Sequence, residues 1–381
     1  MNELKKVYIS LGSNLGNRLQ NLQDAVFLLG KEVGVTKTIS KVYESPSWGF
    51  DAPDFLNACL EVETIFAPMA LLEKILIIEK KMGRERTQEN GYTSRNIDID
   101  ILFYGNEILQ SVSLTIPHPK LQERKFVLLP LADIAPQFYH PVLGKDTRNL
   151  LQECKDKSQP LKTALKLYIS EEELFSNLSF IAIEGNIGAG KTTLAKKIAE
   201  EYKGKLVLER FADNPFLPKF YEDQGRYAFP LEMSFLADRY QQFTDDTSQF
   251  DLFKNFMVSD YDIYKSLIFA QVTLQKDEFN LYRKLFNLMY KEVKKPRIYV
   301  YLYQSTERLL ENIKNRGRAY EQSIEPTFLD NINKGYFDFF KSYPEQNTLI
   351  IDVGELDFVS RLEDYNTIID KIKNFAIELN I

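Results

Sequence analysis

The sequence predicts two domains of different class, an α+β sandwich followed by an α/β domain with a parallel sheet. The 381 residues exceed what one ordinary core needs. In the first half, strand-like runs are interrupted by two helical patterns, whereas in the second half short apolar strands alternate with long helices. A polar stretch rich in lysine and acids separates the halves. We therefore predict domains at residues 1–158 and 179–381 with a linker at 159–178, in which Leu161–Leu174 is compatible with a short helix.

Composition narrows the class of protein. Lys plus Arg number 48 and Asp plus Glu 54, so the net charge of −6 argues against a nucleic-acid or anionic-membrane partner. Two cysteines and two histidines do not supply a disulfide framework or a four-ligand zinc site. No run of 18 apolar residues predicts a membrane span. We expect a cytoplasmic protein with a reduced pair of thiols.

The elements of the first half alternate between strand and helix patterns. Glycines and polar residues at Gly12–Gly16 form a turn, and Pro68 and Gly83 mark the start and end of a helix. The order predicts a largely antiparallel sheet, which we expect to form a ferredoxin-like sandwich. The predicted strands are Val7–Leu11, Thr36–Glu44, Phe55–Thr64 and Ile97–Phe103, and the helices are Arg18–Gly30 and Pro68–Met82.

Two acids stand out on the strand Ile97–Phe103. Asp98 and Asp100 are two residues apart, so both side chains face the same side of the strand. Carboxylate oxygens held together in this way suit Mg²⁺ bound with substrate phosphates, although a plain solvent-facing strand has the same alternation. The preceding loop, Gly83–Arg95, carries three arginines and two glycines. These features indicate a loop that closes over a polyphosphate.

The acid pair and the arginine loop occur together with two further motifs, Gly12-Ser-Asn-Leu-Gly16-Asn-Arg18 and Pro117-His118-Pro119. With these motifs, the first half resembles 6-hydroxymethyl-7,8-dihydropterin pyrophosphokinases. The resemblance implies transfer of a diphosphoryl group from ATP to 6-hydroxymethyl-7,8-dihydropterin, with AMP released. Asp98 and Asp100 would bind Mg²⁺, and three arginines of the loop, Arg84, Arg86 and Arg95, would stabilise the developing charge. His118 and Arg124 would contact ATP. The implied pterin contacts are Ser45, Pro46, Phe55, Asn57, Tyr92 and Phe126, with Phe55 and Pro119 standing where many relatives carry Tyr.

The second half opens with the short apolar strand Phe180–Glu184, a glycine-rich turn and the helix Thr192–Tyr202. Further β-prone runs lie at Lys205–Leu208, Arg297–Leu302 and Thr348–Val353. Long helical patterns separate them. Strands joined by helices predict a parallel sheet with crossover connections.

The turn Gly185-Asn-Ile-Gly-Ala-Gly190-Lys191-Thr192 matches the phosphate-binding pattern GxxxxGK[ST]. Its glycines, Gly185, Gly188 and Gly190, let backbone amides surround a phosphate, Lys191 reaches the outer phosphates, and Thr192 is a candidate Mg²⁺ ligand. A chance glycine turn is the alternative reading. The motif alone does not separate a small-molecule kinase from a GTPase or a motor ATPase, but no NKxD string is present to read guanine in a GTPase.

With Glu209 after the next strand and Arg316-Gly-Arg318 after the helix Glu307–Lys314, this half resembles the deoxynucleoside kinases. The resemblance implies an α/β P-loop kinase that phosphorylates the 5′-hydroxyl, with Glu209 as general base and the two arginines in a lid. Taken alone, Glu209 could be a strand-end surface acid and the arginines a solvated helix end. The remaining implied residues are Thr193 for ATP, Asp260 for the metal, and Tyr221, Glu232, Arg239 and Glu321 for the nucleoside.

Two departures from that family's pattern affect the predicted site. The arginine usual after the third strand is absent from Val258-Ser-Asp260-Tyr-Asp262, so we expect Arg210 or Arg239 to replace it. Glu232 stands where several relatives have a base-reading glutamine. Likeness around Asp213-Asn-Pro215 favours deoxyadenosine as the nucleoside.

The sequence thus predicts a bifunctional transferase that uses ATP and Mg²⁺ in both halves and forms a homodimer through the kinase domain. The competing hypothesis is an active pterin pyrophosphokinase fused to a degenerate kinase that serves as a nucleotide sensor or assembly module. The missing arginine is the feature that supports this alternative.

Overall fold

The computed structural model describes residues 3–47, 52–84, 94–210, 214–248, 254–291 and 293–380. The chain divides into two compact units, one of Met1–Leu174 with Ile377–Ile381 and one of Phe175–Ala376. No helix in the described ranges combines the length and the apolarity that crossing a membrane requires.

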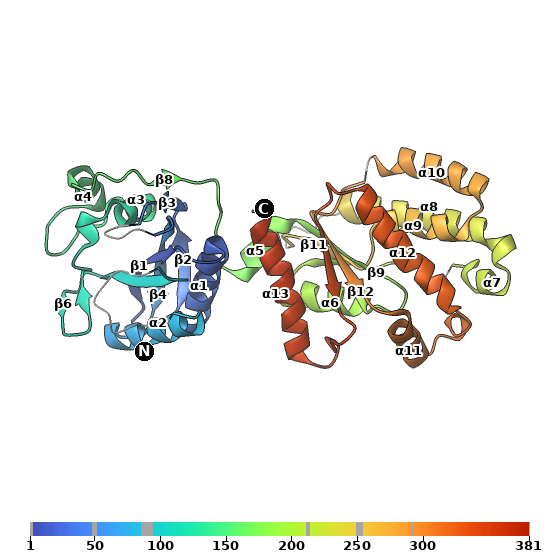
Figure 1. Ribbon diagram of the computed structural model, residues 1–381, viewed down its shortest axis with the longest axis horizontal. Coiled ribbons are helices and arrows are strands. Elements are labelled where there is room, and N and C mark those ends of the chain that lie inside the picture. Colours follow the sequence, from blue (N-terminus) through green and yellow to red (C-terminus); the bar gives the residue numbers. More distant parts are fainter. Residues whose placement is uncertain are drawn as a thin grey trace. The chain divides into compact units, whose positions relative to one another are not determined.

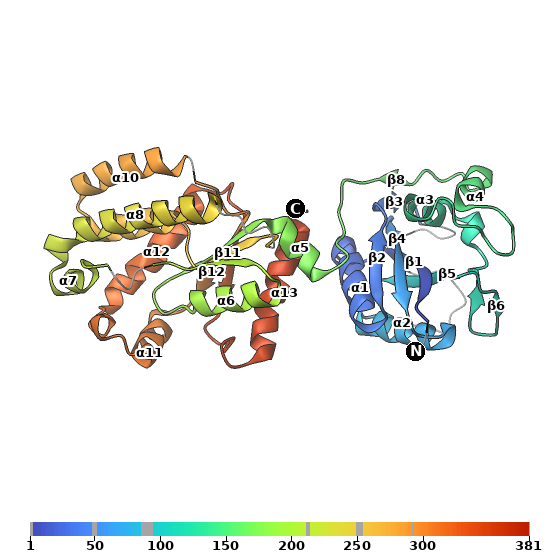
Figure 2. The same cartoon turned by 180° about the vertical axis from the view of Figure 1, so that it is seen from behind.

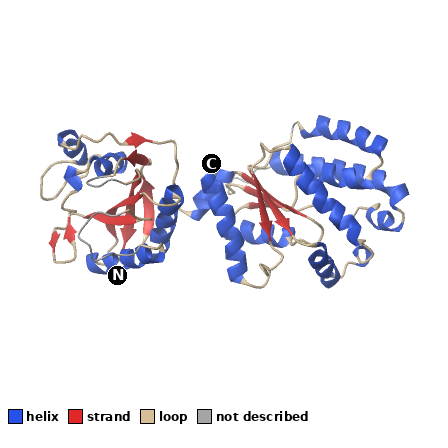
Figure 3. Cartoon of the chain, in the orientation of Figure 1, coloured by secondary structure: helices blue, strands red, loops and turns tan. Residues whose placement is uncertain are grey.

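The first unit contains an antiparallel sheet of six strands in the order β5-β1-β4-β3-β8, with β2 also paired to β4 (Figures 1 and 3). This agrees with the predicted α+β class and antiparallel sheet, while the ferredoxin-like arrangement stays a prediction. Its elements are β1 (Lys5–Ser13), α1 (Arg18–Glu32), β2 (Val35–Ile39), β3 (Tyr43–Ser45), β4 (Phe55–Thr64), α2 (Pro68–Lys81), β5 (Asp98–Tyr104), β6 (Leu109–Gln110), β7 (Thr115–Ile116), η1 (Leu121–Glu123), α3 (Lys125–Ile134), α4 (Thr147–Glu153) and β8 (Leu161–Lys162).

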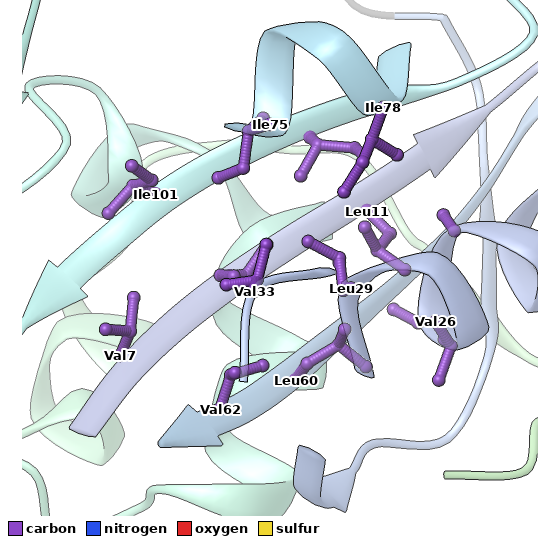
Figure 4. Packing of buried hydrophobic residues seen from close by; sticks show 14 of the residues in the cluster. Val7, Leu11, Val26, Leu29, Val33, Leu60, Val62, Ile75, Ile78 and Ile101 are labelled. Atoms are coloured by element: carbon purple, nitrogen blue, oxygen red, sulfur yellow. The ribbon is translucent and has the colours of Figure 1, made fainter. Parts of the chain in front are cut away.

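Alternation along β1 explains why helices cover both faces of this sheet. Val7, Ile9 and Leu11 belong to the core formed with α1 and α2, whereas Tyr8 between them packs with α3. Figure 4 shows the first of these cores, where side chains of β1 and β4 meet those of α1 and α2: Val7, Leu11, Leu60, Val62, Val26, Leu29, Ile75 and Ile78. With both faces covered, β1 is buried over most of its length and is a rigid support for polar residues at its end.

Two predictions for this unit are corrected by the structure. The single strand expected at Thr36–Glu44 is two strands, β2 and β3. Where a short helix was expected at Leu161–Leu174, the structure has β8, which pairs with β3, and a helix that begins only at Glu171. The side chain of Gln23 exchanges two hydrogen bonds of 2.8 Å with the backbone of Tyr168, so buried polar contacts fix this segment to the sheet domain.

The second unit contains a parallel sheet of five strands in the order β10-β11-β9-β12-β13. This confirms the predicted parallel sheet. Its elements are α5 (Glu171–Leu178), β9 (Phe180–Gly185), α6 (Lys191–Glu201), β10 (Lys205–Val207), α7 (Leu217–Glu222), α8 (Gln224–Ser248), β11 (Met257–Ser259), α9 (Tyr264–Thr273), α10 (Lys276–Tyr290), β12 (Ile298–Tyr303), α11 (Thr306–Arg316), η2 (Ala319–Glu321), α12 (Pro326–Ser342), β13 (Thr348–Asp352) and α13 (Leu362–Glu378).

The arrangement of this unit places polar residues at one edge of the sheet. β9 lies at its centre, and the glycine turn follows its carboxyl end. The helices α8, α9, α10 and α12 pack on one another, and α7 lies against α8 in both views (Figures 1 and 2). Parallel strands bring their carboxyl ends to the same edge, so residues after β9, β10 and β11 can meet there. The strand β11, only three residues long, carries no periodicity that the sequence pattern could reveal.

Candidate functional site

Each unit carries a pocket that contains charged side chains, and the first pocket lies where β1 ends and β4 and β5 begin. Asp98 and Asp100 of β5 are paired in register with Gly12 and Ser10 of β1. A Cβ atom at Gly12 would lie 3.4 Å from Asn57 Oδ1 and 3.9 Å from Asp98 Cβ, so Gly12 stands between the polar side chains of β4 and β5. The local strand register therefore places both acids at the wall of one pocket.

The two acids differ in their environment. Asp98 forms ion pairs with Arg84 at 2.7 Å and with Arg95 at 3.0 Å. Burial, and next the negative charge of Asp98, raise the pKa of Asp100 to about 7. Two carboxylates that repel each other form a donor set that a divalent cation would relieve, so these residues fit Mg²⁺. In the described part of the chain no group of three or more His, Cys, Asp or Glu side chains forms a fuller metal cage.

The arginine and histidine side chains around these acids come from three segments. His118 Nε2 lies 4.0 Å from Asp100 Oδ2, and burial together with the charge of Arg124 lowers the pKa of His118 to about 4. The imidazole is therefore neutral at pH 7, and the ion pair with Asp100 is not formed. Arg124 is buried and lines the pocket. Arg86 and Tyr92 lie outside the described residues.

Glu79 of α2 is a positioning residue that the sequence reasoning missed. Its carboxylate is 2% exposed, contacts the guanidinium of Arg84 and accepts a 3.0 Å hydrogen bond from the backbone N–H of Ile99. It thus ties the end of α2 to β5 beside the acidic pair. The sequence did contain a signal for this role, because Glu79 lies on the otherwise apolar helix face of Leu71, Ile75 and Ile78, and a buried acid needs a partner.

The rest of the first pocket is mostly apolar and contains one amide side chain, that of Asn57. The Asn57 Nδ2 group donates a 2.9 Å hydrogen bond to Ser45 Oγ, and this side chain is buried. All five predicted pterin contacts within the described residues line the pocket: Ser45, Pro46, Phe55, Asn57 and Phe126. A pocket lined by an amide and by aromatic rings can bind a planar heterocycle that both donates and accepts hydrogen bonds.

The second pocket begins at the glycine turn after β9. Gly185, Gly188 and Gly190 have φ angles of 152°, 86° and 88°, which only glycine adopts without strain. The ammonium group of Lys191 donates to the Asn186 carbonyl at 2.8 Å. Burial, and next the positive charge of Lys265, lower the pKa of Lys191 to about 8. Thr193 follows in the first turn of α6.

A network of amide side chains supports this turn and was not predicted. Asn186 Nδ2 donates at 2.8 Å to the Leu329 carbonyl and to Asn333 Oδ1. Asn312 Nδ2 donates at 3.0 Å to the carbonyl of Gly188. These bonds hold the loop from α11 and α12, far along the sequence, and no short motif signals them.

Thr192, Asp260 and Glu209 meet beside the turn. The hydroxyl of Thr192 donates to Asp260 Oδ2 at 2.5 Å, and the backbone N–H of Glu209 donates to Asp260 Oδ1 at 2.8 Å. A hydroxyl and a carboxylate next to a phosphate-binding turn fit Mg²⁺. The carboxyl ends of β9, β10 and β11 thus bring three separate motifs together.

Two cations bind the carboxylate of Glu209. Arg239 donates to Oε1 from Nε at 2.9 Å and from Nη2 at 2.5 Å, and Lys265 Nζ donates to Oε2 at 2.5 Å. The charges of Lys265 and Arg239 outweigh burial and hold the pKa of Glu209 well below its usual range. Of the two arginines expected to replace the missing one, Arg239 makes this contact. Lys265 was not predicted, although it is a buried lysine in the first turn of α9.

The outer wall of this pocket contains the predicted lid. Arg316 and Arg318 both pair with Glu321, the latter at 3.1 Å, and Glu321 is buried. The ring of Tyr221 stacks on Tyr320 with centroids 6.0 Å apart. The arginines are thus satisfied by a nearby acid in this state and lie at the pocket wall.

Glu232 of α8 lines the same pocket. It is 2% exposed, and its Oε1 accepts a 3.1 Å hydrogen bond from Thr273 Oγ1. Burial is the largest cause that raises the pKa of Glu232 to about 7. Phe235 of α8 lines the same pocket, and Phe216 packs against the buried cluster of Phe220, Ala228 and Leu231.

Comparison with known proteins matches each unit to one family. The family model for 7,8-dihydro-6-hydroxymethylpterin-pyrophosphokinase matches residues 8–136, and that for deoxynucleoside kinase matches residues 181–377. The chain is 40% identical over 146 residues to a 2-amino-4-hydroxy-6-hydroxymethyldihydropteridine pyrophosphokinase of Synechocystis sp., which covers 38% of this chain and 74% of that protein.

The second unit has similar matches. The chain is 36% identical over 202 residues to deoxyguanosine kinase of Bacillus subtilis, covering 52% of this chain and 98% of that protein. A solved deoxyadenosine kinase from M. mycoides aligns at 25% identity with a TM-score of 0.45, covering 51% of this chain and 99% of that one. The chain therefore belongs to the 7,8-dihydro-6-hydroxymethylpterin-pyrophosphokinase family in its first unit and to the deoxynucleoside kinase family in its second.

Proposed function

We propose that the first unit transfers the diphosphoryl group of ATP to the hydroxymethyl group of 6-hydroxymethyl-7,8-dihydropterin and releases AMP. The observation that carries this proposal is the pair Asp98 and Asp100 at the wall of a pocket that also holds arginines and a buried amide. Mg²⁺, held by these two acids, would supply charge neutralisation for the triphosphate. The pterin ring would lie between Phe55 and Phe126 and exchange hydrogen bonds with Asn57.

Arginines would stabilise the charge that develops during transfer. Arg84 and Arg95 already lie at 2.7 and 3.0 Å from Asp98, so a small shift brings them to a phosphate beside the metal. Arg86, which lies outside the described residues, is proposed for the same role on the basis of the sequence. His118, neutral at pH 7, would act as a hydrogen-bonding group for ATP together with Arg124.

For the second unit we propose transfer of the γ-phosphoryl group of ATP to the 5′-hydroxyl of a purine deoxynucleoside, with ADP released. The observation that carries it is Glu209 within one backbone hydrogen bond of the Thr192–Asp260 pair. The glycine turn and Lys191 would bind the phosphates, and Thr192 with Asp260 would hold Mg²⁺, which neutralises the transferring group. Arg316 and Arg318 would leave Glu321 for that group, and Tyr221 with Glu321 would hold the 3′-hydroxyl.

Glu209 can receive the 5′-hydroxyl because its carboxylate is not fully used. A carboxylate offers about four lone-pair sites. Arg239 and Lys265 occupy three of them. The remaining site on Oε2 can accept the substrate hydroxyl and point its oxygen at the γ-phosphate. Because the bound cations keep Glu209 ionised, orientation of the nucleophile is its main contribution.

Two purine deoxynucleosides are candidates for the substrate of the second unit. Sequence likeness favours deoxyadenosine, and the name of the Bacillus subtilis relative points to deoxyguanosine.

We further propose domains at residues 1–158 and 179–381, a cytoplasmic location and a homodimer formed through the kinase domain. The degenerate-module alternative is disfavoured, because Arg239 and Lys265 supply the cations whose absence supported it.

One assay on the intact chain tests both activities. ATP is incubated with either the pterin or a panel of deoxynucleosides, and AMP is separated from ADP. We expect AMP only with the pterin and ADP only with a deoxynucleoside. Asp98→Ala should abolish AMP release and leave ADP release intact, whereas Glu107→Ala, an exposed acid just beyond β5, should change neither. Glu209→Gln should abolish ADP release alone, and unchanged turnover would remove Glu209 from the mechanism.

A further inference from the structure

The motif Gly12-Ser-Asn-Leu-Gly16 contains a buried amide that the proposed reactions do not use. Asn14 follows the end of β1 and is 2% exposed. Its Oδ1 atom accepts a 2.7 Å hydrogen bond from the backbone N–H of Arg95. Its Nδ2 group donates to Ser94 Oγ at 3.0 Å and to the Pro53 carbonyl at 3.3 Å. A buried amide whose two polar atoms both have partners is held in one orientation, and it fixes those partners in turn.

Asn14 continues the pairing of β1 with β5 beyond the last paired residues of the two strands. The register between these strands ends at Gly12 and Asp98. In an antiparallel sheet, opposite residues exchange N–H and C=O hydrogen bonds. Asn14 makes this exchange with Arg95, because its backbone N–H donates to the Arg95 carbonyl at 3.2 Å and its side-chain oxygen takes the place of a backbone carbonyl. The chain at Arg95, which lies outside β5, is therefore fixed to β1.

Arg95 shares its acidic partner with a second arginine, so its position depends on an anchor. Arg84 and Arg95 both contact Oδ1 of Asp98, at 2.7 and 3.0 Å. Two guanidinium groups at one oxygen repel each other, and each needs a separate contact to stay there. Glu79 holds Arg84 by its guanidinium. Asn14 holds Arg95 by its backbone.

The contact with Pro53 extends this anchor to the other side of the pocket. Pro53 lies just before β4, whose residues Phe55 and Asn57 line the pocket as proposed pterin contacts. One amide group thus ties the chain that carries Arg95 to the chain that leads into the pterin wall. Transfer between two substrates requires that the groups on both sides keep their relative positions.

We propose that Asn14 is the positioning residue for Arg95 and sets how closely its guanidinium meets the charge that develops on the transferring diphosphoryl group. This inference rests on the reaction proposed for the first unit and deepens it. Asn14 does not occur among the described residues that line the pocket, so it acts through its neighbours. Because Arg95 is proposed to act on developing charge, its displacement should lower kcat rather than weaken substrate binding.

The test is a double-mutant cycle in the intact chain, with AMP formation followed from labelled ATP so that slow variants stay measurable. Asn14→Ala should lower kcat about 10- to 100-fold, as expected for lost buried hydrogen bonds. The KM values for ATP and the pterin should change less than about threefold. In the Arg95→Ala background the same substitution should lower kcat less than about twofold, because no guanidinium is left to position.

Three outcomes of this cycle overturn the inference. The first is a loss of similar size with and without Arg95, which would assign Asn14 a structural role alone. The second is an unchanged kcat in Asn14→Ala. The third is a raised KM for the pterin at unchanged kcat, which would assign Asn14 to the pterin wall.

Asn21→Ala is the matched control. Asn21 Nδ2 donates to Ser13 Oγ at 3.1 Å and to the Leu15 carbonyl at 2.8 Å, so this amide holds the same turn from α1. Its kcat should equal that of the parent protein within about twofold. An equal loss in Asn21→Ala and Asn14→Ala would show that the turn as a whole sets the rate, and would overturn the inference.

A second variant decides the matter where Asn14→Ala does not fold. Ser94→Ala removes one acceptor of the Asn14 amide from a half-buried position. It should lower kcat about 3- to 10-fold with Arg95 present and have no effect in Arg95→Ala, and an equal loss in both backgrounds overturns the inference. Absence of AMP from the parent protein with ATP and the pterin would refute the proposed reaction and the inference with it. An active parent with additive losses would refute the inference alone.

Discussion

Lys265→Met is the perturbation that most directly tests the cation pair at Glu209. Lys265 Nζ lies 2.5 Å from Glu209 Oε2, and each of the two side chains is 9% exposed. Methionine keeps an apolar stem of similar length against the ring of Phe269, over which the ammonium group lies at 5.4 Å. The substitution therefore removes the charge with little loss of packing.

The expected loss of unfolding free energy follows from the burial of Glu209 and from Arg239, the cation that remains bound to it. Removing one member of a buried ion pair costs about 3–5 kcal/mol, because the other charge stays buried. Arg239 still donates to Glu209 through Nε and Nη2, so we expect the lower end, about 3 kcal/mol. With a urea m-value of about 2.5 kcal/mol/M, the unfolding midpoint should fall by about 1.2 M.

The assay must report this unit alone, so unfolding in urea is followed by hydrogen exchange in peptides of α8 and α9. Glu209 has a folded pKa below its unfolded value, so its stabilisation is present above the unfolded pKa of about 4.3 and is lost as pH falls further. The difference between the variant and the parent should therefore be full at pH 7 and shrink below pH 4. The matched control is Lys284→Met, an exposed lysine on α10. A midpoint shift no larger than that of the control would refute the reasoning.

Three further predictions concern the first unit. Glu79→Gln removes the charge that holds Arg84 beside β5, so AMP formation should fall about tenfold and urea stability by about 1–3 kcal/mol, whereas a purely structural role would lower stability alone. The pKa of His118 is about 4, so its titration ends below pH 6. We therefore expect His118→Asn to lower the rate of AMP formation. The shape of its pH profile between pH 6 and 8 should be the same as that of the parent protein. A profile that changes shape would show that His118 titrates in this range. Phe55→Ala should raise the KM for the pterin about tenfold and leave that for ATP unchanged, and an equal rise for ATP would place Phe55 outside the pterin pocket.

Local sequence was sufficient for motifs whose chemistry lies in adjacent residues. The glycine turn after β9 needs its residues at fixed spacing, because one backbone segment makes the whole phosphate site. The alternation of Asp98 and Asp100 likewise follows from the period of a strand. Both signals are local, so the sequence alone was enough to propose a phosphate site and a metal site there.

Contacts between distant segments were beyond the sequence. The residues around Lys265 in the sequence give no sign of a contact with Glu209, which is 56 residues away. Packing of α9 beside the end of β10 nevertheless brings Lys265 Nζ to 2.5 Å from Glu209 Oε2. Glu79 and the amides that hold the glycine turn were missed for the same reason. The short strand β11 and the strands split from Thr36–Glu44 also depend on pairing partners rather than on local propensity.

The amino-acid sequence by itself determined that the chain has two units of different class, and it supplied the motifs on which the proposed phosphate sites rest. Only the tertiary structure decided which cations surround Glu209 and how the segment after residue 158 attaches to the first sheet. The physical reason is that motifs act through neighbouring residues on one strand or turn. Burial and electrostatic pairing depend instead on which elements pack together, and that is set by the whole core.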